Sequence, residues 1–442
     1  MSRDSPPASP TYPQDICNLV IDELQVHRPT LQNCSIISRP WLHPSRIHLL
    51  REIAISIGDS SDPKDIVKFT NALMTQSTEF AYYIRSLVIE GYAISGRLSR
   101  PRLYSSLPLG DLFAILDQLP RLNLLTLDHA KFYSGGPDVT DLVKYSSLEA
   151  FRFKTTFQEG PYDYKSLFLQ LLLHFPNVTD LDLSLHSSPS LDEYPITFPH
   201  KHLRQKIKSL KLEASAAQGP VLKSLFNIVC FSELRSIEVV GTTSSLVYPL
   251  GQIVSAASET LEKFSYQMHD VAISSWSILN LSTCKSLTSV SLTVPLTYSA
   301  HATQDRWNAA VSVLSTLLIT ATHPLSIEII FMVETHQYWD ILEAFTPTFG
   351  YLSWSSAREI MNKLNKLNLL FKLEFIITTP NYPLVDDIPA DVVKVCQLAL
   401  KMGFPELDEK DRLSVNYSPA AKFIPDEQRL HTVVPRLGEE IA

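Results

Sequence analysis

The sequence predicts an α/β chain in which a short helical module precedes a long array of helix–strand repeats. Leucine accounts for 62 of the 442 residues, which is 62/442 or about 14%, and one apolar strand pattern recurs at a nearly constant spacing. Residues 12–50 differ in character and show helical spacing. Because 442/150 is about three, length alone allows one to three domains.

Three short helices are expected in the N-terminal module. Pro13 and Asp15 favour the start of the first helix, and its apolar face carries Ile16, Val20, Ile21 and Leu24. Thr30 can cap a second helix, and Pro44 with Ser45 can open a third. The second helix would carry Leu31, Cys34, Ile37 and Trp41. So few residues bury little apolar surface alone, so we expect them to pack either on the first repeat or on another protein.

The repeated pattern is apolar-x-x-apolar-x-apolar, and eight copies in near-regular register lie between residues 84 and 292. Successive copies begin 38, 26, 30, 29, 27, 27 and 26 residues apart, which is close to the spacing of leucine-rich repeats. The copies are Ile84/Leu87/Ile89, Leu122/Leu125/Leu127, Leu148/Phe151/Phe153, Val178/Leu181/Leu183, Ile207/Leu210/Leu212, Leu234/Ile237/Val239, Leu261/Phe264/Tyr266 and Leu287/Val290/Leu292.

Segments with helical spacing precede several of these copies, at residues 109–119, 165–175, 221–230 and 250–257. Alternating helices and strands at this interval predict a leucine-rich-repeat solenoid with parallel strands and helices on one face. Further strands are expected around Ile327 and Leu373, where the pattern weakens. We therefore divide the chain into an N-terminal tail (1–11), a helical module (12–52), a repeat array (53–380), a C-terminal helical cap (381–416) and a loose tail (417–442).

Side chains alternate along a strand, so the residues between the apolar positions face the open side of the sheet. They are mostly polar and mixed in sign, and each one alone is adequately explained as a solvated residue. Together they predict a concave surface that binds a partner protein. The candidate substrate-binding residues are Asp128, Arg152, Lys154, Asp182, Lys211, Glu238 and Lys263.

Composition excludes several classes of protein. With 38 basic and 46 acidic residues the net charge is −8, which disfavours nucleic acid as a partner because phosphate contacts need a concentrated basic patch. No run approaches the roughly 18 to 20 apolar residues that cross a bilayer, so no membrane partner is expected. Residues 1–10 lack the apolar core of a signal peptide. We therefore expect an intracellular protein, in the cytoplasm, the nucleus or both.

Catalytic and metal-binding motifs are missing from the sequence. Only 13 glycines occur, and neither glycine-rich phosphate-binding motif is present. The five scattered cysteines predict neither disulfides nor a zinc site. His200 and His202 form the one metal-like pair, and two ligands do not make a site. The acidic pairs Asp180/Asp182 and Asp386/Asp387 are best explained as solvated charge. We expect no enzyme, no metal and no cofactor.

The helical module resembles an F-box. The pattern of that family is roughly L-P-x-E-I-x-x-x-I-F-x-x-L followed by L-x-x-x-x-x-V-S-R-x-W. Its first half is matched by Pro13, Asp15, Ile16, Val20, Ile21 and Leu24, and its second half by Leu31, Cys34, Ile37, Ser38, Arg39 and Trp41. Tyr12 stands where leucine is usual, and Pro40 is expected to interrupt the end of the second helix.

An F-box followed by leucine-rich repeats resembles the F-box-like proteins of mushroom-forming (basidiomycete) fungi. The resemblance implies the substrate-recognition subunit of a Skp–cullin–F-box ubiquitin ligase. In that arrangement the F-box binds the Skp adaptor, which links to a cullin scaffold, and the repeats present an unknown substrate protein. The adaptor-binding residues would be Pro13, Ile16, Val20, Ile21, Leu24, Leu31, Cys34, Ile37 and Trp41. The alternative is a repeat scaffold for protein–protein interaction without a ligase.

Overall fold

A computed structural model of the chain divides into two compact units, Met1–Glu149 and Ala150–Ala442. It describes residues 13–57, 64–75, 78–91, 106–133, 147–157, 177–187, 205–214, 228–240, 244–267, 279–296, 300–317, 325–334, 367–376, 404–409 and 413–418, with isolated residues between these ranges. Each unit is α/β, and every strand pairing resolved between these residues is parallel.

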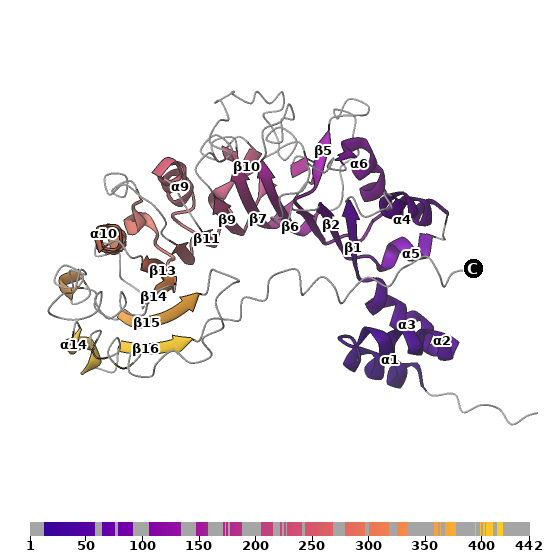
Figure 1. Cartoon of the computed structure of the whole chain (residues 1–442), viewed down its shortest axis with the longest axis horizontal. Coiled ribbons are helices and arrows are strands. Elements are labelled where there is room, and N and C mark those ends of the chain that lie inside the picture. Colours follow the sequence, from indigo (N-terminus) through magenta and orange to yellow (C-terminus); the bar gives the residue numbers. More distant parts are fainter. Residues whose placement is uncertain are drawn as a thin grey trace, which may run out of the picture. The chain divides into compact units, whose positions relative to one another are not determined.

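The first unit begins with three helices, as the sequence predicts (Figure 1). These are α1 (Gln14–Glu23), α2 (Arg28–Ile37) and α3 (Arg39–Leu50). Both α1 and α2 pack against α3. The core between them consists of Ile21, Leu31 and Cys34, which are buried, with Leu24, Trp41 and Leu49 packed against it. The module therefore has a small apolar core of its own.

Two helix boundaries differ from the prediction. The second helix begins at Arg28, because the His27 ring accepts a hydrogen bond from the Thr30 amide (3.3 Å) and caps it. The third helix begins at Arg39, not at Pro44, so Trp41 belongs to α3. The expected interruption of the second helix by Pro40 is wrong: Pro40 lies in the first turn of α3, where a missing N–H breaks no helical hydrogen bond.

The rest of the first unit contains parallel strands in the order β1-β2-β4. Its elements are β1 (Glu52–Ile57), α4 (Lys64–Thr75), α5 (Thr78–Tyr83), β2 (Ser86–Gly91), β3 (Ser106–Pro108), α6 (Leu109–Asp117), β4 (Leu124–Asp128) and β5 (Lys131–Tyr133). Strand β2 ends at Gly91, where a Cβ atom would lie only 2.2 Å from the backbone oxygen of His129. His129 follows β4 with a positive φ of 51°, and the two strand ends therefore meet closely.

In the second unit the strand order is β6-β7-β9-β11-β12-β13-β14-β15-β16. These strands are β6 (Leu148–Phe157, which starts at the boundary), β7 (Val178–Ser187), β9 (Ser209–Ala214), β11 (Ser236–Val240), β12 (Lys263–Gln267), β13 (Ser289–Leu296), β14 (Leu325–Glu334), β15 (Leu367–Ile376) and β16 (Leu413–Ser418). All eight predicted apolar triplets fall on or just before a strand, and their residues are buried. The sequence pattern did not predict β1 or β16.

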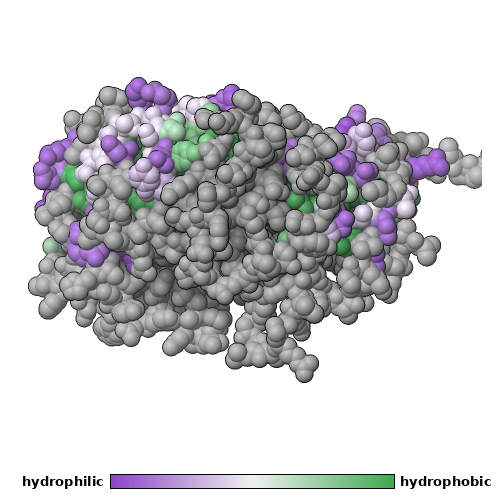
Figure 2. All heavy atoms as spheres, turned by 90° about the horizontal axis from the view of Figure 1, so that it is seen from above, coloured by the Kyte–Doolittle hydropathy of each residue, from purple (hydrophilic) through white to green (hydrophobic). Residues whose placement is uncertain are grey.

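Helices α9 (Ser244–Ala256) and α10 (Ala300–Thr316) lie on one side of the strands of the second unit (Figure 1). Val247, Leu250 and Val254 of α9 are buried, as is Trp307 of α10, whose ring lies 5.7 Å from that of Phe331. The segment predicted as a helix at 221–230 ends in a short strand, β10 (Val229–Cys230). Most of the C-terminal helical cap predicted at 381–416 lies outside the described residues. On the face drawn in Figure 2, the described hydrophobic residues are interleaved with hydrophilic ones.

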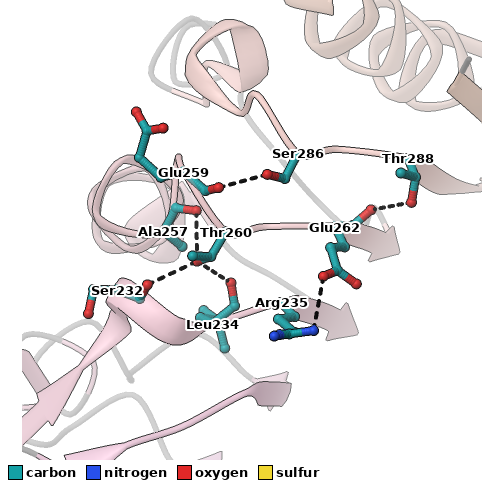
Figure 3. A network of polar contacts seen from close by, with 9 residues as sticks. All are labelled: Ser232, Leu234, Arg235, Ala257, Glu259, Thr260, Glu262, Ser286 and Thr288. Atoms are coloured by element: carbon teal, nitrogen blue, oxygen red, sulfur yellow. Dashed lines mark hydrogen bonds and ion pairs between the residues drawn. The ribbon is translucent and has the colours of Figure 1, made fainter. Parts of the chain in front are cut away.

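Consecutive repeats of the second unit are joined at the amino ends of their strands by a hydrogen-bond ladder (Figure 3). Backbone amides donate to a carbonyl of the preceding repeat, as Glu262 N does to Arg235 O (2.8 Å) and Thr288 N to Glu262 O (2.9 Å). Side chains add to this ladder: the hydroxyl of Thr260 donates to Leu234 O (2.9 Å), and that of Ser286 to Glu259 O (2.7 Å). The ladder satisfies polar groups where the chain enters each strand.

Replacing Thr260 with valine keeps the side-chain shape but removes the hydroxyl that reaches Ser232 O and Leu234 O in the preceding repeat. We expect a loss of about 1–2 kcal/mol in the free energy of unfolding, because the carbonyls lose a partner. Urea denaturation measures it. Thr293→Val on β13, whose hydroxyl makes no hydrogen bond among the described residues, is the control and should change stability less. Equal effects of the two variants would contradict the ladder's role.

Replacing Gly91 with alanine places a methyl group against the backbone of His129 and Ala130. Because the obstructing atoms belong to the main chain, they cannot rotate away, and we expect a loss of about 1–3 kcal/mol. Thermal denaturation followed by circular dichroism measures the change. An unchanged melting temperature would show that the ends of β2 and β4 do not need this close approach.

Candidate functional site

Helix α1 carries an exposed apolar stripe made of Ile16, Leu19 and Val20. Their exposed fractions are 48%, 66% and 39%. The three residues stand at i, i+3 and i+4, so they share one side of the helix, while Cys17 and Ile21 are buried in the unit. The module's core is thus complete without this stripe. Exposed apolar side chains grouped in this way mark interaction sites more often than isolated ones do.

A second group of exposed apolar residues lies at the two ends of α2. Ile36 and Ile37 close the helix and are exposed, as is Val26 just before it. Within the part of the chain that the structure describes, most large exposed hydrophobic residues belong to the three N-terminal helices. The exposed apolar side chains of the described residues are therefore concentrated in this module.

The structure divides the nine predicted adaptor-binding residues into three sets. Those exposed at the surface are Pro13, Ile16, Val20 and Ile37. Leu24 and Trp41 are half-buried against the core, and Ile21, Leu31 and Cys34 form the core itself. The last three hold the helices together and have no surface to offer a partner. Leu19 and Ile36 were not predicted, although Leu19 stands three residues after Ile16, on the same side of the helix.

The same module also packs on the strands and helices that follow it. Helix α3 contacts α5 and β1, and the hydroxyl of Tyr83 lies 2.7 Å from Nδ1 of His43, with their rings edge to face at 5.4 Å. The sequence left open whether the module packs on the first repeat or on another protein, and the structure shows that it packs on the elements that follow it. This packing does not use the stripe on α1, which stays exposed.

The second unit has a polar strand face opposite its buried apolar positions. Parallel pairing places one polar residue of each strand in a single row across the sheet. The row consists of Asp182, Lys211, Glu238, Ser265, Ser291 and Glu328. We call this the polar row. A neighbouring row, two residues earlier on each strand, contains Asp180, Ser209, Ser236, Lys263, Ser289 and Ser326.

Charges at the start of the polar row neutralise one another. Lys211 Nζ lies 2.8 Å from Oε1 of Glu238 on the next strand. Burial opposes the charge on Lys211, but the hydrogen bond and charge of Glu238, with Asp182 and Glu213, raise its pKa above the ordinary value. Burial raises the pKa of Asp182, and the cations Lys211, Lys154 and Arg152 counteract that effect only in part.

Six of the seven predicted substrate-binding residues therefore belong to the polar strand face of the second unit. They are Arg152, Lys154, Asp182, Lys211, Glu238 and Lys263. Asp128 lies in the first unit, in register with Glu90 and 3.4 Å from the His129 ring. Burial and the charge of Asp128 raise the pKa of Glu90. Glu328, which ends the polar row, was not predicted because its repeat departs from the regular spacing.

Metal binding, membrane crossing and cysteine nucleophilicity find little support in the described ranges. They contain no group of three histidine, cysteine or acidic residues able to hold a metal ion. They also contain no helix long and apolar enough to cross a membrane. Burial raises the pKa of the Cys284 thiol to about 11, which disfavours the nucleophilic thiolate. His200, His202, Asp386 and Asp387 lie outside the described residues.

Comparison with known proteins adds no relative: the chain matches no protein-family model and no curated protein. The described residues present two candidate surfaces for function. One is the apolar stripe of the first unit, and the other is the polar strand face of the second.

Replacing Asp182 with asparagine tests the electrostatics of the polar row. Its folded-state pKa is raised, so the ionised carboxylate costs free energy at neutral pH, and that cost vanishes once the pH falls below the unfolded value of about 4. We expect Asp182→Asn to be more stable than the wild type near neutral pH and equal to it in acid. Denaturation curves at several pH values measure this. A variant that is less stable at neutral pH would show that the cations outweigh burial.

Proposed function

We propose that this protein is a substrate-recognition subunit of a Skp–cullin–F-box ubiquitin ligase. The N-terminal module is an F-box that docks on the Skp adaptor, which connects it to a cullin scaffold. The parallel strands are those of a leucine-rich-repeat solenoid, and their polar face is the concave surface that binds a target protein. The observation that carries the proposal is the apolar stripe of Ile16, Leu19 and Val20, exposed on a module whose core is complete without it.

The energetics of the stripe favour a partner. Three exposed aliphatic side chains on one side of a helix gain roughly 1.5–3 kcal/mol each when fully buried, and half-exposed residues gain a fraction of that. Ile36, Ile37 and Val26 add to the apolar area of the same small module. The F-box resemblance of residues 12–41 supplies the identity of the partner, since those residues match the adaptor-binding pattern.

The polar strand face supports the second half of the proposal. Its side chains are half-buried or exposed, mixed in sign and held by parallel strands in fixed register. Such a surface is suited to recognising another protein through hydrogen bonds and charge pairs, and repeat arrays commonly use it so. This chain would contribute proximity and no chemistry of its own: binding a target beside an activated ubiquitin raises the effective concentration of the reacting groups.

The double variant Ile16→Asp/Leu19→Asp tests adaptor docking. Both side chains are exposed, so the module should still fold, while two carboxylates placed in an apolar interface should abolish capture of the Skp adaptor. Pull-down of purified adaptor by the full-length chain measures it, with circular dichroism to verify folding. The matched control is Leu398→Asp/Met402→Asp, two exposed apolar residues outside the module, which should bind as the wild type does.

A repeat scaffold without a ligase remains the second candidate, supported by the packing of α3 on α5 and β1. That candidate expects no capture of the adaptor by the folded wild-type chain. Failure of the wild type in the same pull-down would therefore overturn the ligase proposal and favour the scaffold.

A further inference from the structure

Among the described residues, the two opposite charges at the far end of the polar strand face, Lys263 and Glu328, have no partner of opposite charge. Lys263 on β12 is exposed, and its ammonium group makes no ion pair or hydrogen bond within the described part of the chain. Glu328 on β14 is half-buried, and among the described side chains its carboxylate accepts only one hydrogen bond, from the hydroxyl of Ser291 (3.2 Å). Lys211 and Glu238, in contrast, satisfy each other at 2.8 Å.

Small hydroxyl side chains occupy the space around these two charges. In the same two rows they are Ser236, Ser265, Ser289, Ser291 and Ser326. Serine hydroxyls both donate and accept hydrogen bonds, and their small size lets a bound main chain approach the sheet. A long or apolar side chain at these positions would have prevented that approach.

We propose that this area binds an extended polypeptide segment that carries an acidic residue opposite Lys263 and a basic residue opposite Glu328. The two charges lie two strands and two residues apart, which at about 4.8 Å per strand and 3.3 Å per residue is about 12 Å. In an extended segment, side chains four positions apart point the same way and lie about 13 Å apart. The matching pattern is therefore acidic-x-x-x-basic, or its reverse.

This inference deepens the proposed function, on which it rests for the role of the segment as part of a ligase target. The binding chemistry itself needs only the polar strand face. Charge complementarity excludes a purely acidic or purely basic partner, because either would bring a like charge against Lys263 or Glu328.

A display library of random 12-residue peptides, selected on the immobilised full-length chain, tests the inference. We expect the wild type to enrich peptides with opposite charges four positions apart. The single charge reversal Lys263→Glu should weaken binding of those peptides at least tenfold, because two acidic side chains then face the segment and one contact is repulsive whichever way it runs. The matched control Lys211→Glu/Glu238→Lys keeps an internal pair and should bind them within about twofold of the wild type.

Enrichment without the charge pattern, or equal binding by the reversed variant, would overturn the inference. So would a selection that yields no specific peptide at all. Adaptor pull-down with the same variants separates this result from the proposed function. If the adaptor is captured while the peptides fail, only the inference on the polar face is wrong; if the peptides bind while no variant or wild type captures the adaptor, the ligase proposal is wrong.

Discussion

The structure depends on burial of two apolar rows that run across the parallel strands of the second unit. One row contains Leu181, Leu210, Ile237, Phe264, Val290 and Ile327, and all six side chains are buried. The second row, two residues later, begins with Leu183 and Leu212. A single helix–strand repeat cannot cover its own apolar face, so each repeat is stabilised by packing against the next one. Shifting one strand by a single residue would expose its apolar set and bury its charges.

That constraint also determines the geometry of the polar face. Apolar burial sets the register of the strands. The polar side chains of adjacent strands therefore lie opposite each other, and no additional interaction is needed to align them. Lys211 therefore meets Glu238 across one strand boundary, and Ser291 meets Glu328 across another. Ion pairs outside the strands repeat the same interval: Arg235–Glu262 and Lys285–Glu259 join residues 27 and 26 positions apart. Exposed pairs of this kind add little stability, and their regular spacing follows from the register.

Sequence reasoning succeeded where one physical requirement dominates and was less successful where several compete. The triplets were found because a strand between two neighbours must bury every second residue. For β15 the pattern suggested Leu370, Leu373 and Phe375, whereas the register places Leu369 and Phe371 opposite Ile327 and Ile329, so this repeat begins four residues earlier than predicted. Strand β1 carries the same triplet, Leu50/Ile53/Ile55, which was missed because Leu50 also fits the third helix, and β16 lacks the first apolar residue of the triplet. In the helical module, the pattern grouped apolar residues on one helix face and could not separate the buried Ile21 from the exposed Ile16 and Val20.

That last distinction has a physical consequence for any chain of this kind. Helices α1, α2 and α3 are short, and their core consists of three buried side chains with three more packed around it. A core so small cannot also accommodate Ile16, Leu19 and Val20, because one helix face can meet only one set of neighbours. Those residues must therefore either remain in water or be covered by another surface, and helix α3 already uses its own contacts for α5 and β1. Among the described residues no packing covers the stripe on α1, so burial of this stripe against another surface would be favourable.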